Sequence, residues 1–399
     1  MGLATAALIA TSRVAERVRV HVFDARPLPA RSPAAVDLRV YALSRASQNV
    51  CDQLGIWREI APRACPYRRM HVWEGDLPEG PAAIDFDSAE IGEPDLGHIV
   101  EDAVLREALA SVVAAQPNAE ITTGAVLADI VQSGHSVEAK LGDGGALRGT
   151  LLVAADGSES AVRKLLDLPA MGHAYGQTAL VTHVATELAH RHTAWQRFLP
   201  GGPLAFLPLF DGRSSVVWSL PSADAERLLA APDEALVAEL QTASAGVLGA
   251  LGPVAGRGGF PLQALHALKY CRARVALIGD AAHTVHPLAG QGMNLGLLDA
   301  ACLAAVIEAA VEAGEDPGDL KVLHRYERER KGDNLQMLLA FDGLNRLFRL
   351  PAWAASVRAA GLLAVDGSGA TKRIFMRRAL GLNARGQKRL RYPHVFAQS

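Results

Sequence analysis

Short apolar runs alternate along the first part of the chain with longer stretches of helical period. Apolar runs that close on an acidic residue occur at 19–24, 151–156 and 275–280. Such runs are too short for helices, and flanking glycines favour buried strands. Helical stretches are expected at 2–16, at 45–54, from about 101 to 109, and from Met293 to about 306. This alternation of strands and helices predicts a parallel sheet covered by helices.

The pattern changes between residues 177 and 260. Strands separated by turns are expected at 177–186, 203–210 and 214–220, followed by helices at 222–231 and 233–243. Strands joined by short turns predict a second, antiparallel sheet. Its aromatic residues are more typical of plain core than of a pocket, so we assign them no role. They are Trp195, Phe198, Phe206, Phe210 and Trp218. A long helix is expected at 318–348.

Polar residues follow three of the predicted core strands. Asp24, Asp156-Gly157 and Asp280 stand where these strands end. In open α/β sheets, ligands bind at the carboxyl ends of the strands. Gly290-Gln291-Gly292 allows the backbone to approach a flat ligand, and the helix that follows directs its positive end toward that loop. We therefore expect one ligand crevice at this edge.

Composition and charge exclude several classes of protein. The 399 residues are 50% hydrophobic and 21% charged, with a formal net charge of −2. These values are typical of a globular protein with a large core and argue against nucleic acid as a partner. The four cysteines form no C-x-x-C pair, which favours reduced thiols in the cytoplasm. We expect no membrane-spanning run, and no metal site at His283 and His286, because no second ligand cluster supports one.

Three motifs resemble a known family. GDAAHTVHPLAGQGMNLGLLDA is similar to the second FAD motif of the class A flavoprotein aromatic hydroxylases, and DGSESAVR resembles their DG motif. LHRYERERKGDNLQMLLAFDGLNRLF resembles, more narrowly, the hydroxylases of ubiquinone biosynthesis. The resemblance implies an α/β fold. It would comprise a Rossmann-like FAD-binding domain with a three-layer parallel sheet, an inserted, mostly antiparallel substrate domain and a C-terminal helical region.

The resemblance also implies domain boundaries. The FAD-binding domain would be discontinuous and N-terminally incomplete, comprising residues 1–70, 97–175 and 262–322. The substrate domain would comprise 71–96 and 176–261, and the C-terminal helices and basic tail 323–399. Gly2 matches the last glycine of a G-x-G-x-x-G loop. The strand and the earlier glycines are absent from this sequence, which predicts either a start codon further upstream or a natural truncation.

The resemblance assigns cofactor-binding roles to particular residues. Asp24 would hold the adenosine ribose, Asp280 the ribityl chain, and Arg39 the flavin side of the cofactor. For Arg39 the alternative, a surface arginine before the helix at 45–54, stays open. Pro287, Gly290 and Gln291 would lie nearest the ring, and no catalytic side chain or metal ligand is implied. The full set is Gly2, Asp24, Arg39, Asp156, Gly157, Asp280, Pro287, Gly290, Gln291, Gly292, Met293 and Asn294.

The implied activity is ring hydroxylation by an FAD-dependent monooxygenase. NAD(P)H would reduce FAD, and O₂ would then form a flavin C4a-hydroperoxide that transfers one oxygen to a polyprenylated phenol in ubiquinone biosynthesis. Two alternatives stay open. One is a related hydroxylase of a soluble aromatic substrate, and the other is a catalytically silent, FAD-poor subunit of a biosynthetic complex. The resemblance also implies a ubiquinone-biosynthesis complex as a partner.

The end of the chain is basic and partly apolar. Its cations are Lys372, Arg373, Arg377, Arg378, Arg385, Lys388, Arg389 and Arg391, and no acidic residue follows Asp366. Ile374, Phe375, Met376 and Leu380 are interleaved with them. This pattern is typical of a segment that contacts an anionic membrane surface, although a solvated tail is the alternative. We therefore expect a cytoplasmic protein that is peripheral on the inner face of the membrane.

Overall fold

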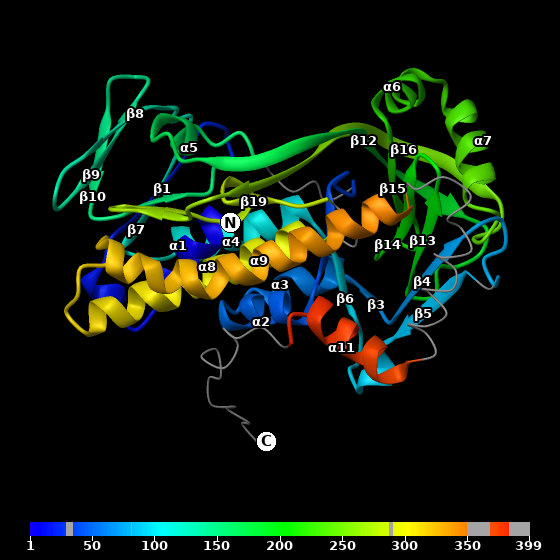
Figure 1. Ribbon diagram of the computed structural model, residues 1–399, viewed down its shortest axis with the longest axis horizontal. Coiled ribbons are helices and arrows are strands. Elements are labelled where there is room, and N and C mark those ends of the chain that lie inside the picture. Colours follow the sequence, from blue (N-terminus) through cyan, green and yellow to red (C-terminus); the bar gives the residue numbers. More distant parts are fainter. Residues whose placement is uncertain (29–34, 81, 287–289, 349–367, 383–399) are drawn as a thin grey trace.

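Two lobes lie end to end and are joined by two long strands (Figure 1). In this computed structural model the described residues are 1–28, 35–80, 82–286, 290–348 and 368–382. The joining strands are β12 (Ala170–Thr186) and β16 (Leu251–Ala267), which pair antiparallel along most of their length. Each strand therefore belongs to both lobes.

The first lobe contains the parallel strands. β1 (Val20–Asp24) pairs with β7 (Ala119–Thr123), and β11 (Leu152–Ala154) pairs with β18 (Val275–Leu277). The short β17 (Cys271–Arg272) runs antiparallel to β18. The expected α/β fold with a parallel sheet is confirmed, with one difference. Among the described strands the sheet is divided in two, because β1 and β11 pair with no strand between them.

The second lobe is built on an eight-stranded sheet. Its strand order is β19-β16-β12-β15-β14-β13-β4-β5, and only the β13–β4 pair is parallel. The strands not yet bounded are β4 (Arg69–Glu74), β5 (Ala83–Asp87), β13 (Thr193–Leu199), β14 (Gly202–Pro208), β15 (Ser214–Pro221) and β19 (His283–Thr284). Helices α6 (Ser222–Ala230) and α7 (Asp233–Ala243) pack on this sheet. The mostly antiparallel inserted sheet is thus confirmed, whereas the exact domain boundaries stay a prediction.

Two smaller sheets complete the first lobe. One has the order β2-β6-β3, with β2 (Val40–Leu43), β6 (Gly97–Glu101) and β3 (Cys65–Tyr67). The other has the order β10-β9-β8, with β8 (Leu127–Gln132), β9 (Val137–Leu141) and β10 (Ala146–Gly149). The helices of this lobe are α1 (Gly2–Ala10), α2 (Arg45–Gln53), α3 (Trp57–Ile60), α4 (Asp102–Ala114) and α5 (Ala161–Leu165).

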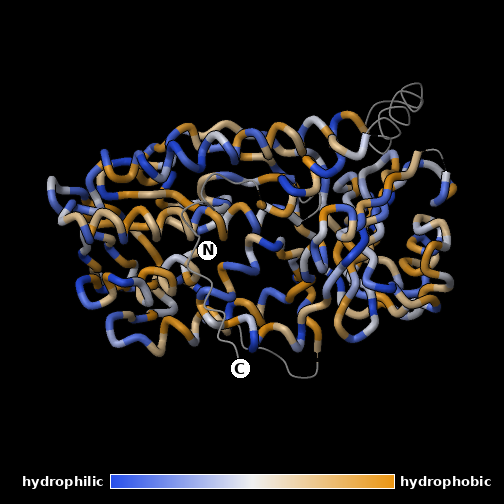
Figure 2. Tube along the Cα trace, turned by 90° about the horizontal axis from the view of Figure 1, so that it is seen from below, coloured by the Kyte–Doolittle hydropathy of each residue, from blue (hydrophilic) through white to orange (hydrophobic). Residues whose placement is uncertain are grey.

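The two longest described helices pack against each other beneath the joining strands. α8 (Gln291–Glu312) is a core helix, and α9 (Leu320–Phe348) buries Tyr326 and Arg330 against it. Hydrophilic and hydrophobic residues alternate along α9 (Figure 2), as expected of a helix with one buried face. The C-terminal helical region expected from the sequence also includes α11 (Gly369–Ala379).

α8 corrects the expectation that no apolar stretch is long enough to cross a membrane. By length and composition this helix could do so, as the one candidate among the described residues. However, 78% of its most apolar window is buried inside the protein. The buried Asn294 and Asp299 form hydrogen bonds with neighbouring elements, so α8 is explained as the core helix of the first lobe.

Two helices are shorter than expected. α1 ends at Ala10 and not near residue 16, because the hydroxyls of Thr11 and Ser12 donate to the carbonyls of Ala7 and Ile9. Such side-chain bonds compete with continuation of a helix. α9 begins at Leu320, two residues after Pro317-Gly318.

A buried charged cluster joins α8, α9 and the turn after β18. The Asp299 carboxylate accepts from Arg330 Nε at 2.7 Å and from Asn334 Nδ2 at 3.0 Å. It lies 2.5 Å from His283 Nε2 and accepts from the Gly279 amide at 3.1 Å. Despite burial, the charges of His283 and Arg330 hold the pKa of Asp299 below its usual range. This cluster fixes the backbone one residue before Asp280.

We predict that Asp299→Asn lowers the free energy of unfolding by about 3 to 5 kcal/mol at pH 7, because it leaves Arg330 as an uncompensated buried charge. Since the pKa of Asp299 is lowered by folding, its contribution is present above the unfolded-state pKa of about 4 and is lost as the pH falls below that value. Denaturant unfolding at pH 7 and pH 3 measures both effects. Glu315→Gln, which removes the partly exposed Glu315–Arg325 pair, is the control and should change little. Equal effects of the two substitutions would contradict the prediction.

Candidate functional site

One continuous cavity of about 1290 Å³ runs through the first lobe and reaches the second. It has three parts. A cleft lies at the ends of β1, β11 and β18, a chamber lies under the eight-stranded sheet, and a slot runs between β1 and β11. Nine of the twelve candidate cofactor residues line the cavity. They are Gly2, Asp24, Arg39, Asp156, Gly157, Asp280, Gly290, Gly292 and Met293.

The first turn of α8 forms one wall of the cleft. Gly290 is the N-cap of this helix and has a left-handed backbone conformation, with φ 63°. A Cβ at Gly290 would also lie 3.3 Å from the Cβ of Ala42. Glycine is therefore required here both by conformation and by the close approach of β2. Gly292 and Met293 face the same cavity, so the positive end of α8 is directed into it.

Asn294 and Gln291 do not line the cavity. The Asn294 amide donates to the carbonyl of Ala42, and its oxygen accepts from the Ser44 amide and the Ser47 hydroxyl. Because these bonds hold the start of α8 against β2 and α2, Asn294 positions the helix. Gln291 is also buried and packs beside Asn294. Pro287 lies outside the described residues.

Asp280 stands at the end of β18, as the sequence predicts. Its side chain opens onto the cleft, and desolvation by the surrounding protein raises its pKa. The amino group of Met1 is buried nearby, and desolvation lowers its pKa while the charges of Asp280 and Asp102 oppose that shift. The cleft thus combines a carboxylate acceptor with the start of α1. A carboxylate of this kind is suited to accept hydrogen bonds from ligand hydroxyl groups.

The opposite end of the cleft lies at Asp24. This residue ends β1, and its Oδ1 accepts from the Arg26 amide at 2.9 Å, which leaves Oδ2 for a ligand hydroxyl. Met1 and Gly2 line the cleft between Asp24 and Asp280. The first amides of a helix have no partner within it, so the start of α1 is suited to an anion such as a pyrophosphate.

The DG segment after β11 has a partly structural role. Gly157 lines the cleft with φ 83°, and Asp156 Oδ2 accepts from the Val162 amide at 3.1 Å. Arg163 is the arginine of the DGSESAVR motif, and its buried guanidinium donates to the carbonyl of Ala281 at 2.7 Å and to that of Ser158. Arg163 therefore joins the DG turn to the turn that carries Asp280.

Arg39 lies where the cleft meets the chamber. Its guanidinium carbon is 4.8 Å from the centroid of the Phe260 ring on β16. The preceding loop is held by Asp37, whose carboxylate accepts from the amides of Arg39 and Ala103. The buried Glu101 accepts from the Asp37 amide in turn. The exposed side chain of Arg39 is thus mounted on a fixed backbone.

The chamber is mainly apolar. Its walls include Met70, Val181, Ala194, Trp195, Ala205, Leu207, Val217, Phe260 and Leu262. Of the five aromatic residues that the sequence left unassigned, only Trp195 lines the chamber. Phe206 and Trp218 are core beneath α6 and α7, and Phe198 stacks on Phe348. Phe210 is exposed beside Arg63. The chamber-lining positions could not be identified from residue type alone.

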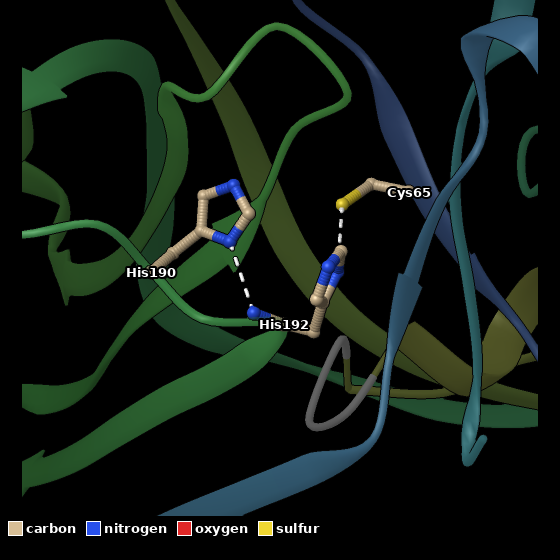
Figure 3. A group of neighbouring side chains, drawn as sticks. All are labelled: Cys65, His190 and His192. Atoms are coloured by element: carbon tan, nitrogen blue, oxygen red, sulfur yellow. Dashed lines mark hydrogen bonds between the residues drawn. The ribbon is translucent and has the colours of Figure 1, made fainter. Parts of the chain in front are cut away.

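The fold also gathers Cys65, His190 and His192, which sequence spacing did not reveal (Figure 3). Their ligand atoms lie within 4.8 Å of one another. However, His190 Nε2 lies 3.2 Å from the Leu209 carbonyl and its Nδ1 accepts from the His192 amide, while His192 Nδ1 lies 3.0 Å from the Pro66 carbonyl. These contacts occupy both ring nitrogens of His190 and Nδ1 of His192, and they join β3 to the loop before β13. We interpret the group as a structural contact between the lobes.

Comparison with known proteins gives the family. The FAD binding domain family matches residues 2–338. The ubiquinone hydroxylase UbiL of Rhodospirillum rubrum is 39% identical over 365 residues, covering 91% of this chain and 84% of that protein. The 3-demethoxyubiquinol 3-hydroxylase of Escherichia coli K12 is 36% identical over 361 residues, covering 90% and 91%.

Solved structures agree on the fold. The p-nitrophenol 4-monooxygenase PnpA of Pseudomonas putida DLL-E4 superposes with a TM-score of 0.77 at 22% identity, covering 96% of this chain and 95% of that one. At this identity the likeness concerns the fold alone. Together with the family match and the two relatives, it leads to one conclusion: the chain belongs to the FAD-dependent aromatic hydroxylases, in the family that includes the hydroxylases of ubiquinone biosynthesis.

Proposed function

We propose that this protein is an NAD(P)H- and FAD-dependent monooxygenase that hydroxylates the aromatic ring of a polyprenylated phenol in ubiquinone biosynthesis. The observation that carries the proposal is the continuity of the cavity, in which a cleft lined by cofactor-type residues opens into an apolar chamber. The two bacterial relatives support the substrate class, because both are named for ubiquinone-pathway hydroxylation.

The residues present fit the cofactor at both ends of the cleft. Asp24 would accept hydrogen bonds from the adenosine ribose, and Asp280 would accept them from the ribityl hydroxyls. The start of α1 would face the pyrophosphate. Gly290 and Gly292 would lie against the isoalloxazine, where the positive end of α8 favours negative charge on the reduced ring. Bound FAD supplies the oxygen chemistry, in which one atom of O₂ enters the substrate ring and the other leaves as water.

The chamber's own contribution is orientation and exclusion of water. Val181, Ala205 and Val217 lie on neighbouring strands of the eight-stranded sheet and face the cavity. Such a surface favours an apolar ring and prenyl chain through burial of apolar area, at roughly 25 cal/mol per Å². A dry chamber also protects a reactive intermediate from water. The protein therefore needs no catalytic side chain of its own for oxygen transfer.

Contact with the membrane surface is proposed to occur through α11. Ile374 and Phe375 are 62% and 57% exposed, and Arg373, Arg377 and Arg378 are exposed beside them. Adjacent exposed apolar and cationic side chains are suited to an anionic lipid interface. A prenylated substrate would be supplied from the same membrane.

Three described residues of the basic segment do not serve this contact. Met376 and Leu380 are buried, and the buried Lys372 pairs with Glu90 at 2.8 Å, so this lysine has an acidic partner that the sequence did not reveal. Arg385, Lys388, Arg389 and Arg391 lie outside the described residues.

The substrate assignment is tested by incubating purified protein with excess FAD, NAD(P)H, O₂ and a synthetic phenol carrying a short prenyl chain. We expect a product that is heavier by one oxygen atom, and ¹⁸O₂ should deliver the label to it. The same phenol without the prenyl chain should react at least about tenfold less efficiently, because it buries less apolar surface. Equal turnover of both phenols would favour a soluble substrate. A colourless protein that does not oxidise NAD(P)H would favour a silent subunit.

The membrane assignment is tested by co-sedimentation with vesicles of phosphatidylglycerol and phosphatidylcholine. We expect binding that grows with the anionic fraction and weakens with salt. The double substitution of Ile374 and Phe375 by serine should abolish most of it. Val131→Ser is a control at an exposed position on β8, which lies at the left edge of the molecule, away from α11 (Figure 1). Binding that is equal for both variants would contradict the assignment.

A further inference from the structure

One buried polar side chain in the wall of the chamber has no partner within the protein. Gln196 lies on β13, is 6% exposed and lines the cavity. Its side-chain amide forms no hydrogen bond in the described part of the chain. Buried polar groups are nearly always hydrogen-bonded, because they lose their contacts with water. An amide that departs from this rule inside a ligand cavity is suited to a partner on the ligand.

The pairing of the strands directs this amide into the chamber. Gln196 pairs with Ala205 on β14, and Ala205 pairs with Val217 on β15. Directly paired residues lie on one face of a sheet, and both Ala205 and Val217 line the chamber. The opposite face carries Leu204 and Phe206, which pack beneath α6 and α7. Neither polar atom of the Gln196 amide is among the fully enclosed atoms that lack a partner, so both open onto the cavity.

The side chains around the amide are apolar, and two of them are small. Ala205 lies directly opposite Gln196, and Ala194 precedes it by two residues on the same face. Val72 pairs with it from β4, on the other side. The two alanines leave room for a ring beside the amide, and none of the three side chains can donate or accept a hydrogen bond. A ring that enters here therefore meets the amide as its polar contact.

The other polar side chains on these strands are less suited to the contact. On β12, β13, β14 and β15 they are Ser219 and Trp195. Ser219 is only 1% exposed, and Trp195 Nε1 is fully enclosed. None of the charged residues in the eight-stranded sheet lines the cavity. Since a phenolate would be buried there without a countercharge, the neutral amide of Gln196 favours an uncharged hydroxyl group.

We propose that Gln196 recognises the ring hydroxyl group of the substrate, with its amide oxygen accepting from the phenolic O–H. The ring then lies against Ala194 and Ala205. The inference rests on the proposed function and deepens it, because it names the substrate group that the chamber selects. An apolar chamber alone discriminates between ligands by size and apolar area. A site built to hydrogen-bond a hydroxyl group also rejects the analogue that lacks it.

The test measures the binding of two probes, geranylphenol and geranylbenzene, which differ only in the hydroxyl group. Equilibrium dialysis uses the full-length protein with excess FAD and without NAD(P)H, so that no turnover occurs. Gln196→Met keeps the length of the side chain and removes the amide. We expect it to raise the dissociation constant of geranylphenol about tenfold, through loss of the hydrogen bond. The dissociation constant of geranylbenzene should stay equal or fall, because no unpaired amide is then buried under the ring.

Two further variants control for effects on folding. Gln196→Leu removes the amide with a side chain of different shape, and it should show the same selectivity between the probes. Gln53→Met makes the matched change at an exposed position on α2 and should bind both probes as the unsubstituted protein does. The dissociation constant of FAD should be equal in all four proteins, because Gln196 forms no hydrogen bond that supports the cleft.

The outcomes distinguish the contact from the proposed function. Equal weakening for both probes would indicate a structural role and would overturn the proposal, as would unchanged binding of geranylphenol in the Gln196 variants. Selective loss of geranylphenol binding, with no hydroxylated product once NAD(P)H is added, would establish the contact and reject the hydroxylase. Hydroxylated product from a protein whose Gln196 variants bind both probes as before would reject the contact and keep the hydroxylase.

Discussion

The candidate site depends on the buried carboxylate of Asp299. A single charged group, enclosed by Arg330, Asn334 and His283, holds the turn after β18 through the Gly279 amide. Such a cluster is stable only while every member is paired, since an isolated buried charge is strongly unfavourable. The position of Asp280 in the cleft is therefore set by contacts on the far side of the turn from the cavity.

The same arrangement connects distant parts of the chain. α9 supplies Arg330 and Asn334, and Tyr326 on the same helix donates to the Leu277 carbonyl at 2.8 Å. A helix that touches no part of the cavity thus supports β18 and the turn after it, which places Asp280 in the cavity wall. On the other side, Arg163 links the DG turn to Ala281. Three separate segments, α8, α9 and α5, thus hold three backbone groups of this turn, at Leu277, Gly279 and Ala281.

Much of this organisation could be predicted from the sequence. Strand ends at Asp24, Asp156 and Asp280 were predicted from short apolar runs closed by an acid, and all three line the cavity. The Asp299 cluster was not predicted, because its members are far apart in sequence and His283 was considered only as a metal ligand. A buried aspartate within the apolar run of α8, and Arg330 and Asn334 one helical turn apart, were the available signals. Strands β13 and β16 were not predicted either, because they depend on tertiary pairing, which no local pattern encodes.

FAD is proposed to bind in the cleft beside Asp280. The most direct measurement is equilibrium dialysis of FAD against the full-length protein, its Asp280→Ala variant and Asp129→Ala, an exposed control on β8. Loss of a charge-assisted hydrogen bond worth about 1.5 to 3 kcal/mol predicts an FAD dissociation constant about ten- to a hundredfold higher for Asp280→Ala. Asp129→Ala should match the unsubstituted protein. An unchanged dissociation constant for Asp280→Ala would contradict the account.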